Sequence, residues 1–407
     1  MELLKQVSDP RHQSYITYGN HVLMMTRILS AIFYINTMRK TSAEFNCETA
    51  IANIGYICGE QLEEIPYWET INDYLKRVEP QELQNTVCEL VRRLLRCRAF
   101  EHSRIRDKYW HILIDGTQTF SSQEELDGNY IFRVHKKNQD GEYIEYCYYV
   151  LEAKLVLRDN IVVSIMTEFV ENKDTEAEKQ DCERKACYRL MERLKETFPR
   201  LHLCLGGDSL YACEPFFNLC ENFGWRYIVR YKEGSIPTLY TEYESLRKIE
   251  ANLRKWTKNQ RAYWYDFVNS IDYNKHQINF LAYGESEKTY PFYFLTNLPV
   301  SHKNALTSVF YGRRRWAIEN YGFNAQKNHG FAIEHLFSKD CQAMKNHYYL
   351  IQIAHMISQI MDAWKSLWDG ISLSLEQKHR RMLESWKTDR LTELTSCTCS
   401  AFQIRFE

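Results

Sequence analysis

The sequence has few residues that interrupt regular structure, since only 15 glycines and 8 prolines occur among its 407 residues. This scarcity excludes collagen-like and low-complexity chains. At roughly 100–200 residues per domain, the chain is long enough for about two to four domains with sizeable cores. We therefore expect a folded globular protein that is large enough to be an enzyme.

Long hydrophobic runs are also missing. The most apolar segment near the N-terminus, residues 22–36, carries Arg27 near its centre and is shorter than the roughly 20 apolar residues of a membrane span. We expect a buried helix there. Met1 leads into a polar, charged segment without the apolar centre of a signal peptide, so the expected location is the cytoplasm.

Two kinds of motif are absent. The sequence contains neither a GxxxxGK[ST] nor a GxGxxG phosphate loop, which argues against nucleoside triphosphate chemistry. Its 13 cysteines include no CxxC pair, and Cys397 and Cys399 lack a second pair at zinc spacing. We expect reduced, mostly buried thiols, with no disulfides and no structural zinc site.

Net charge is nearly absent as well, because 52 Lys and Arg residues face 53 Asp and Glu residues. This balance excludes a uniformly basic, histone-like protein. The charge is unevenly distributed, however: residues 59–82 carry seven acids and two basic residues, whereas residues 92–108 carry seven basic residues and two acids. The local net charge therefore changes from −5 to +5, and the second segment either binds DNA or is a solvated helix face.

Three regions differ in hydrophobic pattern. Residues 1–105 have apolar residues at helical spacing, and we expect a helical domain that binds DNA. Residues 106–340 are expected to form an α/β core in which three strands precede a helix, a strand, a helix and a strand, with a β-rich insertion at about residues 232–300. Residues 341–407 return to helical spacing and end in a tail.

Two aspartates follow apolar strands of this core. Asp115 comes after residues 111–114, in the run IDGT, and Asp208 comes after residues 201–205, in GGDS. If the two strands are neighbours, both carboxylates lie at one edge of the sheet, where open α/β sheets place their sites. The alternative for each is an Asp that opens a turn or caps a helix.

A third carboxylate lies in an expected helix, RRRWAIENYGFNAQKNHG. Arg315 precedes Glu319 by four residues and Lys327 follows it by eight, so these charges share one face. The helix also contains apolar residues, among them Trp316, and we expect it to pack on the sheet and direct Glu319 to the strand ends. The alternative is an exposed stripe of salt bridges.

The order IDGT, GDSLY and RRRWAIENYGFNAQK resembles the three blocks of DDE-type insertion-sequence transposases, a cut-and-paste group with a ribonuclease H-like core and a β-rich insertion before the last acid. The resemblance covers about residues 105–340. It implies that Asp115, Asp208 and Glu319 are the catalytic, metal-binding triad. The DPR run at residues 9–11 is also similar to the N-terminal region of this group.

The group's signature around the last acid is Tyr, two residues, Arg, three residues, Glu, six residues, Lys. Arg315 and Glu319 match its central spacing, whereas Tyr311 is one residue early and Lys327 one residue late. Gly312 and Gln326 occupy the places of the tyrosine and the lysine. The resemblance therefore assigns DNA contacts to Arg315 and, at shifted positions, to Lys327 and Tyr311.

The same resemblance implies an activity: cleavage at transposon ends and transfer of the freed 3′-hydroxyl to target DNA. Three carboxylates suit two Mg²⁺ ions, which Mn²⁺ can replace. The expected partners are double-stranded DNA, as terminal inverted repeats and target, and a second copy in a synaptic homodimer that associates with the nucleoid. Arg314 joins the phosphate contacts, and Trp316 either stacks on an unpaired base or packs in the core.

Other residues are weaker candidates. Glu168 is either an additional site carboxylate or a structural residue, and His329 and His335 either contact DNA or hold the fold together. Two other functions remain open. One is a transposase-derived DNA-binding protein without catalysis, and the other is a nuclease of the same fold that cleaves without joining.

Overall fold

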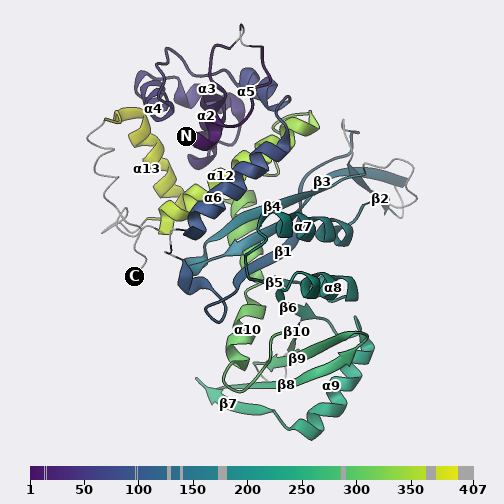
Figure 1. The fold of residues 1–407 in the computed structure, drawn as a ribbon. Helices are drawn as coiled ribbons and strands as arrows, with labels where there is room; N and C mark the ends of the chain where they lie inside the picture. Colours follow the sequence, from purple (N-terminus) through teal and green to yellow (C-terminus); the bar gives the residue numbers. More distant parts are fainter. Residues whose placement is uncertain are drawn as a thin grey trace.

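The computed structural model describes residues 1–12, 14, 16–96, 98, 100–125, 130–137, 141–172, 181–285, 290–363 and 373–392. Cys397 and Cys399 lie outside these residues. The chain forms a helical region at one end, a long mixed sheet through the middle and a strand-rich region at the other end (Figure 1). None of the described helices combines the length and apolar character needed to span a membrane.

Helices dominate the first hundred residues. They are α1 (Glu2–Lys5), α2 (Asn20–Ile32), α3 (Met38–Phe45), α4 (Glu48–Cys58), α5 (Trp68–Leu75), α6 (Pro80–Arg96) and the 3₁₀ turn η2 (Glu101–Ser103). Helix α2 contains most of the apolar segment expected to be buried, and nearly all of its residues are buried. It packs against α1, α4, α5 and the C-terminal helix α12 (Cys341–Ala363).

Ten strands form one sheet. They are β1 (Trp110–Ser122), β2 (Ile131–Lys137), β3 (Gly141–Val156), β4 (Val162–Val170), β5 (Leu203–Gly207), β6 (Arg226–Tyr231), β7 (Arg254–Lys258), β8 (Arg261–Tyr273), β9 (His276–Gly284) and β10 (Phe292–Thr296). The order is β2-β3-β1-β5-β6-β10-β9-β8-β7, and β4 also pairs with β3. The sheet is mixed, because β5 runs parallel to β1 and β6 whereas the other pairings are antiparallel.

The remaining helices cover the sheet or extend from it. They are α7 (Glu183–Thr197), α8 (Glu214–Asn222), α9 (Pro237–Glu250), α10 (Ala305–Arg313), the π-helix η5 (Ile318–Phe323), α11 (Asn324–Asn328), α12 and α13 (Leu375–Thr388), with 3₁₀ turns η3 (Arg158–Asn160) and η4 (Ser209–Tyr211). Helix α7 packs on β3 and β4, while α12 packs on β4 and on the N-terminal helices (Figure 1). The C-terminal α12 thus completes the N-terminal helical region.

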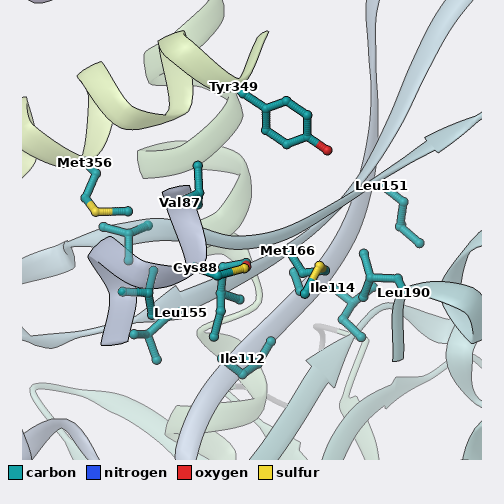
Figure 2. Packing of buried hydrophobic residues seen from close by; sticks show 14 of the residues in the cluster. Val87, Cys88, Ile112, Ile114, Leu151, Leu155, Met166, Leu190, Tyr349 and Met356 are labelled. Carbon is teal, nitrogen blue, oxygen red and sulfur yellow. The ribbon is translucent and has the colours of Figure 1, made fainter. Parts of the chain in front are cut away.

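One hydrophobic core joins these parts. Figure 2 shows Cys88 of α6 beside side chains of the sheet such as Ile112 and Met166, with Leu190 of α7 and Tyr349 of α12 nearby. All five side chains are at most 3% exposed. The sheet and the helices from both ends of the chain therefore depend on the same buried surface for stability.

A buried ion pair lies between the sheet and α12. Glu152 and Lys154 on β3 are both 0% exposed, with 3.5 Å between their charged groups. The Lys154 ammonium donates to Gln352 of α12 at 2.9 Å and lies 5.4 Å from the ring centre of Phe323 in η5. Glu152 accepts hydrogen bonds from two hydroxyls of β4 and from Tyr348 of α12. The network thus connects β3, β4, α12 and η5.

The structure differs from the sequence-based expectation in several elements. It contains β2 and α9, which the hydrophobic pattern did not separate from their surroundings. Helix α7 begins at Glu183, whereas helical spacing in the sequence begins at about residue 175; residues 175–180 lie outside the described residues. The first strand continues to Ser122, so the expectation that a strand ends at Asp115 is wrong: β-branched and polar residues follow Gly116, and β3 pairs with them.

The buried pair yields a stability prediction. Replacement of Lys154 by Ala leaves the Glu152 carboxylate buried without its cation, and we expect the free energy of unfolding to fall by about 3–5 kcal/mol. The matched control is Arg380→Ala, which removes an exposed cation from a pair with Glu384 and should cost less than about 1 kcal/mol. Urea denaturation measures both values. Equal effects of the two substitutions would contradict the role of the buried pair.

Candidate active site

Asp115 lies within β1, opposite Glu152 of β3. The parallel pairing of β1 with β5 stops at Leu113 and Gly206, two residues before Asp115. Because side chains alternate along a strand, Asp115 faces the same side of the sheet as Leu113, whose side chain packs against η5. The Asp115 carboxylate also accepts the backbone N–H of Gly116 at 3.0 Å.

Asp208 follows β5 directly. Its carboxylate accepts the backbone N–H of Leu210 at 2.8 Å and caps the turn η4. The turn-capping role considered for this aspartate is therefore real. Asp208 still lies near Asp115 in this role, because its charge raises the pKa of Asp115. The structure thus brings both carboxylates to the end of the β1–β5 pair, as expected from adjacent strands.

Arg315 joins this edge from a distant part of the chain. Its guanidinium donates to the Asp115 carboxylate at 3.2 Å, across a sequence separation of 200 residues. The segment that follows packs on β1, β3 and β4, since Ala317, Ile318 and Phe323 share a buried cluster with Leu113 and side chains of β3 and β4. The expectation that this helix packs against the sheet is confirmed.

Glu319 lies in the π-helix η5. It is exposed, and no hydrogen bond or ion pair joins its side chain to another described residue. Glu319 follows Arg315 by one helical turn, about 6 Å along the axis at a rise of about 1.5 Å per residue. Glu319 is therefore close along the chain to Arg315, which contacts Asp115, but no contact joins the side chain of Glu319 to either aspartate in the described part of the chain.

The π-helix affects the direction of Lys327, which lies one residue after the family's lysine position. Hydrogen bonds in a π-helix span one residue more than those in an α-helix, so a single π turn inserts one residue into the helical register. Lys327 after this turn takes the direction that a residue seven positions after Glu319 has in an unbroken α-helix. Gln326, at the family's lysine position, is instead buried and donates to Gln352 and His355.

The other expected DNA contacts have different environments. Lys327 forms an ion pair with Glu334 at 2.9 Å. Arg314 is half-buried and donates to the Leu157 carbonyl, and Tyr311 is half-buried with its ring edge-on to His111. Trp316 is 57% exposed. The alternative that Trp316 belongs to the core is wrong.

Glu183, a carboxylate that the sequence analysis missed, lies close to this edge. It begins α7 and accepts hydrogen bonds from the hydroxyls of Tyr149 at 2.6 Å and Tyr211 at 2.5 Å. A Cβ on Gly116 would lie only 2.8 Å from the Glu183 carboxylate, so the absence of a side chain at Gly116 admits this close approach. The glycine of the IDGT motif was the sequence feature that could have indicated such a neighbour, because it leaves room on the face of β1 opposite Asp115.

These charges alter the acidity of Asp115. Burial raises its pKa, the Arg315 guanidinium lowers it, and the nearby carboxylates of Glu183 and Asp208 raise it further. The net result is a pKa of about 7, well above the usual 3.8. A carboxylate whose pKa is raised by burial and by like charges is typical of functional sites.

The chemistry of these donors suits a hard cation, because Asp115, Asp208 and Glu319 offer only carboxylate oxygens, the ligands that Mg²⁺ and Mn²⁺ prefer. A cation near Asp115 would also offset the repulsion that raises the pKa of this carboxyl group. In the described part of the chain, however, no three carboxylate, imidazole or thiol groups are close enough together to hold one metal ion.

The weaker candidates have structural partners. Glu168 is 8% exposed and accepts from Arg189 at 2.7 Å and Arg193 at 2.6 Å, which gives it a structural role. His335 contacts the ring of Phe337, and His329 is exposed after α11. Several residues of the basic run contact the protein itself, among them Arg92, Arg104 and Arg106. The three arginines 313–315 also have partners within the protein, although Arg313 is exposed.

Comparison with known proteins identifies no family for this chain. No protein-family model matches the chain, and no curated protein matches it. Among solved structures, the fold is similar to that of piggyBac transposase in a synaptic complex with hairpin DNA, at 11% sequence identity and a TM-score of 0.39. The similarity covers 96% of this chain and 79% of that chain. A similarity of this size defines neither the family nor the function of this protein.

The raised pKa of Asp115 leads to a pH-dependent prediction. Between pH 3.8 and about 7, the unfolded chain releases the Asp115 proton before the folded chain does. Stability contributed by this proton is therefore present below pH 3.8 and lost as pH rises to about 7. Asp115→Asn removes this dependence.

Accordingly, the free energy of unfolding of Asp115→Asn minus that of the wild type should rise by roughly 1–4 kcal/mol from pH 4 to pH 8. Urea denaturation in EDTA at several pH values measures this difference. Because the comparison uses the change with pH, a constant effect of the asparagine cancels. A difference that is flat with pH would show that the pKa of Asp115 is not raised.

Proposed function

We propose that the protein is a DDE-type DNA transposase that cleaves DNA at transposon ends and joins the 3′-hydroxyl to target DNA. The observation that carries this proposal is the meeting of Asp115, Asp208 and Arg315 at the end of the parallel β1–β5 pair. These residues come from the three separate motifs that resemble the transposase blocks. Their convergence in space supports a common role for the three motifs.

The sheet supports a ribonuclease H-like core. Strand β3 pairs antiparallel with both β1 and β4, and β5 and β6 continue the sheet parallel to β1. Helix α9 and strands β7–β10 follow β6 and precede the helical segment with Glu319, which is the place of a β-rich insertion in this family. The insertion extends the sheet through the β6–β10 pairing.

Asp115, Asp208 and Glu319 would hold two Mg²⁺ ions, or Mn²⁺ in their place. Such ions activate a water or a 3′-hydroxyl and neutralise the leaving oxygen. Arg315 holds the Asp115 carboxylate and lies within reach of a phosphate at the same edge, for which a guanidinium is well suited. Lys327, turned toward the Glu319 side by η5, supplies a second cation. The exposed Trp316 presents a ring on which an unpaired base can stack.

The partners follow from this reaction. The substrates are duplex DNA molecules, namely the terminal inverted repeats and the target, and a homodimer holds the two ends together. This activity places the protein at the nucleoid. Arg314 and Tyr311 would support the segment near the phosphate. Arg314 donates a hydrogen bond to the carbonyl of Leu157, which follows β3, and the ring of Tyr311 packs on His111 of β1.

A DNA-binding protein without catalysis is the second candidate. It is favoured by the exposed Glu319, which contacts neither aspartate, and by the absence of a three-ligand metal cluster among the described residues. A nuclease that cuts without joining differs from a transposase only in the product. Assays that follow binding, cleavage and joining separately distinguish all three.

The first test replaces Asp208 by Asn. With duplexes that carry the inverted repeats flanking the reading frame, Mg²⁺-dependent cleavage should fall by about a thousandfold or more, because a metal ligand is lost. Binding of the same duplex should persist. Asp272→Asn, which changes an exposed carboxylate of β8, is the matched control and should cut normally. Undiminished cutting by Asp208→Asn would overturn the triad, and a wild type that binds without cutting would favour the second candidate.

The second test identifies the third carboxylate. Glu319→Gln should abolish cleavage as Asp208→Asn does, whereas Glu183→Gln should reduce it far less, because two tyrosine hydroxyls already hold Glu183 on the opposite face of β1. Cleavage rates of both variants are compared under identical Mg²⁺ concentrations. The reverse order of effects would assign the third ligand to Glu183.

A further inference from the structure

A large cleft lies between the N-terminal helices and the segment that connects α11 to α12. Its volume is about 870 Å³. One wall is formed by the start of α3 and by one face of α5, and the other by residues 335–340. We call it the α3–α5 cleft. It is separate from the edge of the sheet that holds Asp115.

The charged side chains of this cleft are mostly positive. They are Arg39, Lys76 and Lys339, with Asp340 as the acid; His335 also lines the cleft, but burial and the charge of Arg27 lower the pKa of its imidazole. The Asp340 carboxylate is already used, because it accepts the backbone N–H of Ala343 at the start of α12. No ion pair joins Arg39 or Lys339 to another described residue, whereas Lys76 pairs with the exposed Asp73. The cleft therefore presents cations that are available to an anion.

Uncharged polar groups of the cleft also lack partners. The buried indole N–H of Trp68 and the buried amide oxygen of Asn72 make no hydrogen bond with any described residue. They lie on one face of α5 together with Lys76, at successive intervals of four residues. Buried polar atoms are normally satisfied, so the Trp68 N–H is left for an acceptor such as a phosphate oxygen, and the Asn72 oxygen for a donor such as a bound water.

A buried arginine, Arg27, lies behind Phe337 in the wall of the α3–α5 cleft. Arg27 of α2 is 1% exposed, and its guanidinium stacks on the ring of Phe337, 4.2 Å from the ring centre. It donates to Ser30 and His347, but one of its terminal nitrogens has no partner, and no carboxylate among the described residues pairs with it. Phe337 lines the cleft. An uncompensated buried charge is costly, and an anion in the cleft would offset part of this cost.

One residue that lines the cleft also lies near β1, the strand that contains Asp115. Phe337 also lines a small buried cavity together with Thr119 of β1. Thr119 follows Asp115 by four residues, which corresponds to roughly 13 Å along the strand.

We infer that the α3–α5 cleft binds the sugar–phosphate backbone of duplex DNA whose reacting bond lies at the Asp115 edge. This inference rests on the proposed function, which makes DNA the substrate. Guanidinium and ammonium groups contact phosphate oxygens, while Trp68 and Asn72 provide one donor and one acceptor for the backbone and the water around it. Contacts of this kind fix the position of the duplex without reading its sequence.

The test uses the full-length protein and a 30-base-pair duplex with a fluorescent label, titrated between 50 and 300 mM KCl. Arg39→Gln combined with Lys339→Gln should weaken binding at least tenfold and reduce the slope of log affinity against log salt by about 2, since each lost phosphate contact removes about 0.9. The control combines Lys40→Gln with Arg380→Gln. It removes the same charge from exposed residues that do not line the cleft and should leave the slope unchanged.

Further measurements make the result decisive. Both double variants should unfold within about 1 kcal/mol of the wild type, because the four side chains are exposed. Hydrogen exchange of residues 335–340 should slow when the duplex is bound. Equal slopes for the cleft variant and the control would overturn the inference. So would competition by tripolyphosphate alone at the duplex's own concentration, because it would identify a small-anion pocket.

The test of DNA binding by the cleft and the test of DNA cleavage can give different results. A protein that binds the duplex through the cleft but does not cut DNA supports the inference and rejects the transposase proposal. A protein that cuts DNA, and whose cleft variant binds as the wild type does, rejects the inference and leaves the transposase proposal intact. A protein that binds no DNA rejects both.

Discussion

The candidate site depends on the short parallel pairing of β1 and β5. Four residue pairs, from Trp110 with Leu203 to Leu113 with Gly206, fix the two strands side by side and in register. The pairing then stops, so the next polar residues of both strands come to one edge. Asp115 and Asp208 are close because of this register. A shift by one residue would turn Asp115 to the opposite face of the sheet.

Charge balance at this edge involves a cation from the third motif. Burial, together with the nearby carboxylates of Glu183 and Asp208, raises the pKa of Asp115 to about 7, although Arg315 acts in the opposite direction. The guanidinium of Arg315 therefore offsets part of the negative charge of these carboxylates when no metal ion is bound. The position of Arg315 depends in turn on the packing of η5 against the sheet and on the buried Lys154, whose chain lies against Gly322.

Periodicity and motifs predicted much of this arrangement. Alternating apolar residues indicated the strands that contain or precede Asp115 and Asp208, and the apolar face around Ile318 indicated a helix packed on the sheet. The spacing of residues did not predict the π turn, in which Phe323 and Gly322 lie against Lys154, a residue of a distant segment. Spacing along the sequence therefore left Lys327 one residue out of place. Glu183 escaped notice for a similar reason, since only the folded structure brings α7 beneath Gly116.

The packing of α12 and α13 on the first helices has a consequence for synthesis of the chain. Helix α2 is covered by α12, and His379 of α13 contacts the carbonyl of Ile32 across 347 residues. At about 5–20 residues per second, a ribosome needs on the order of 20–70 seconds to make the chain between these contacts. During this time the apolar surfaces of α2 and α4 lack their final cover, so nascent chains must rely on chaperones or on provisional packing. The Asp115 edge likewise lacks Arg315 until most of the chain has emerged, which delays assembly of the site until translation is nearly complete.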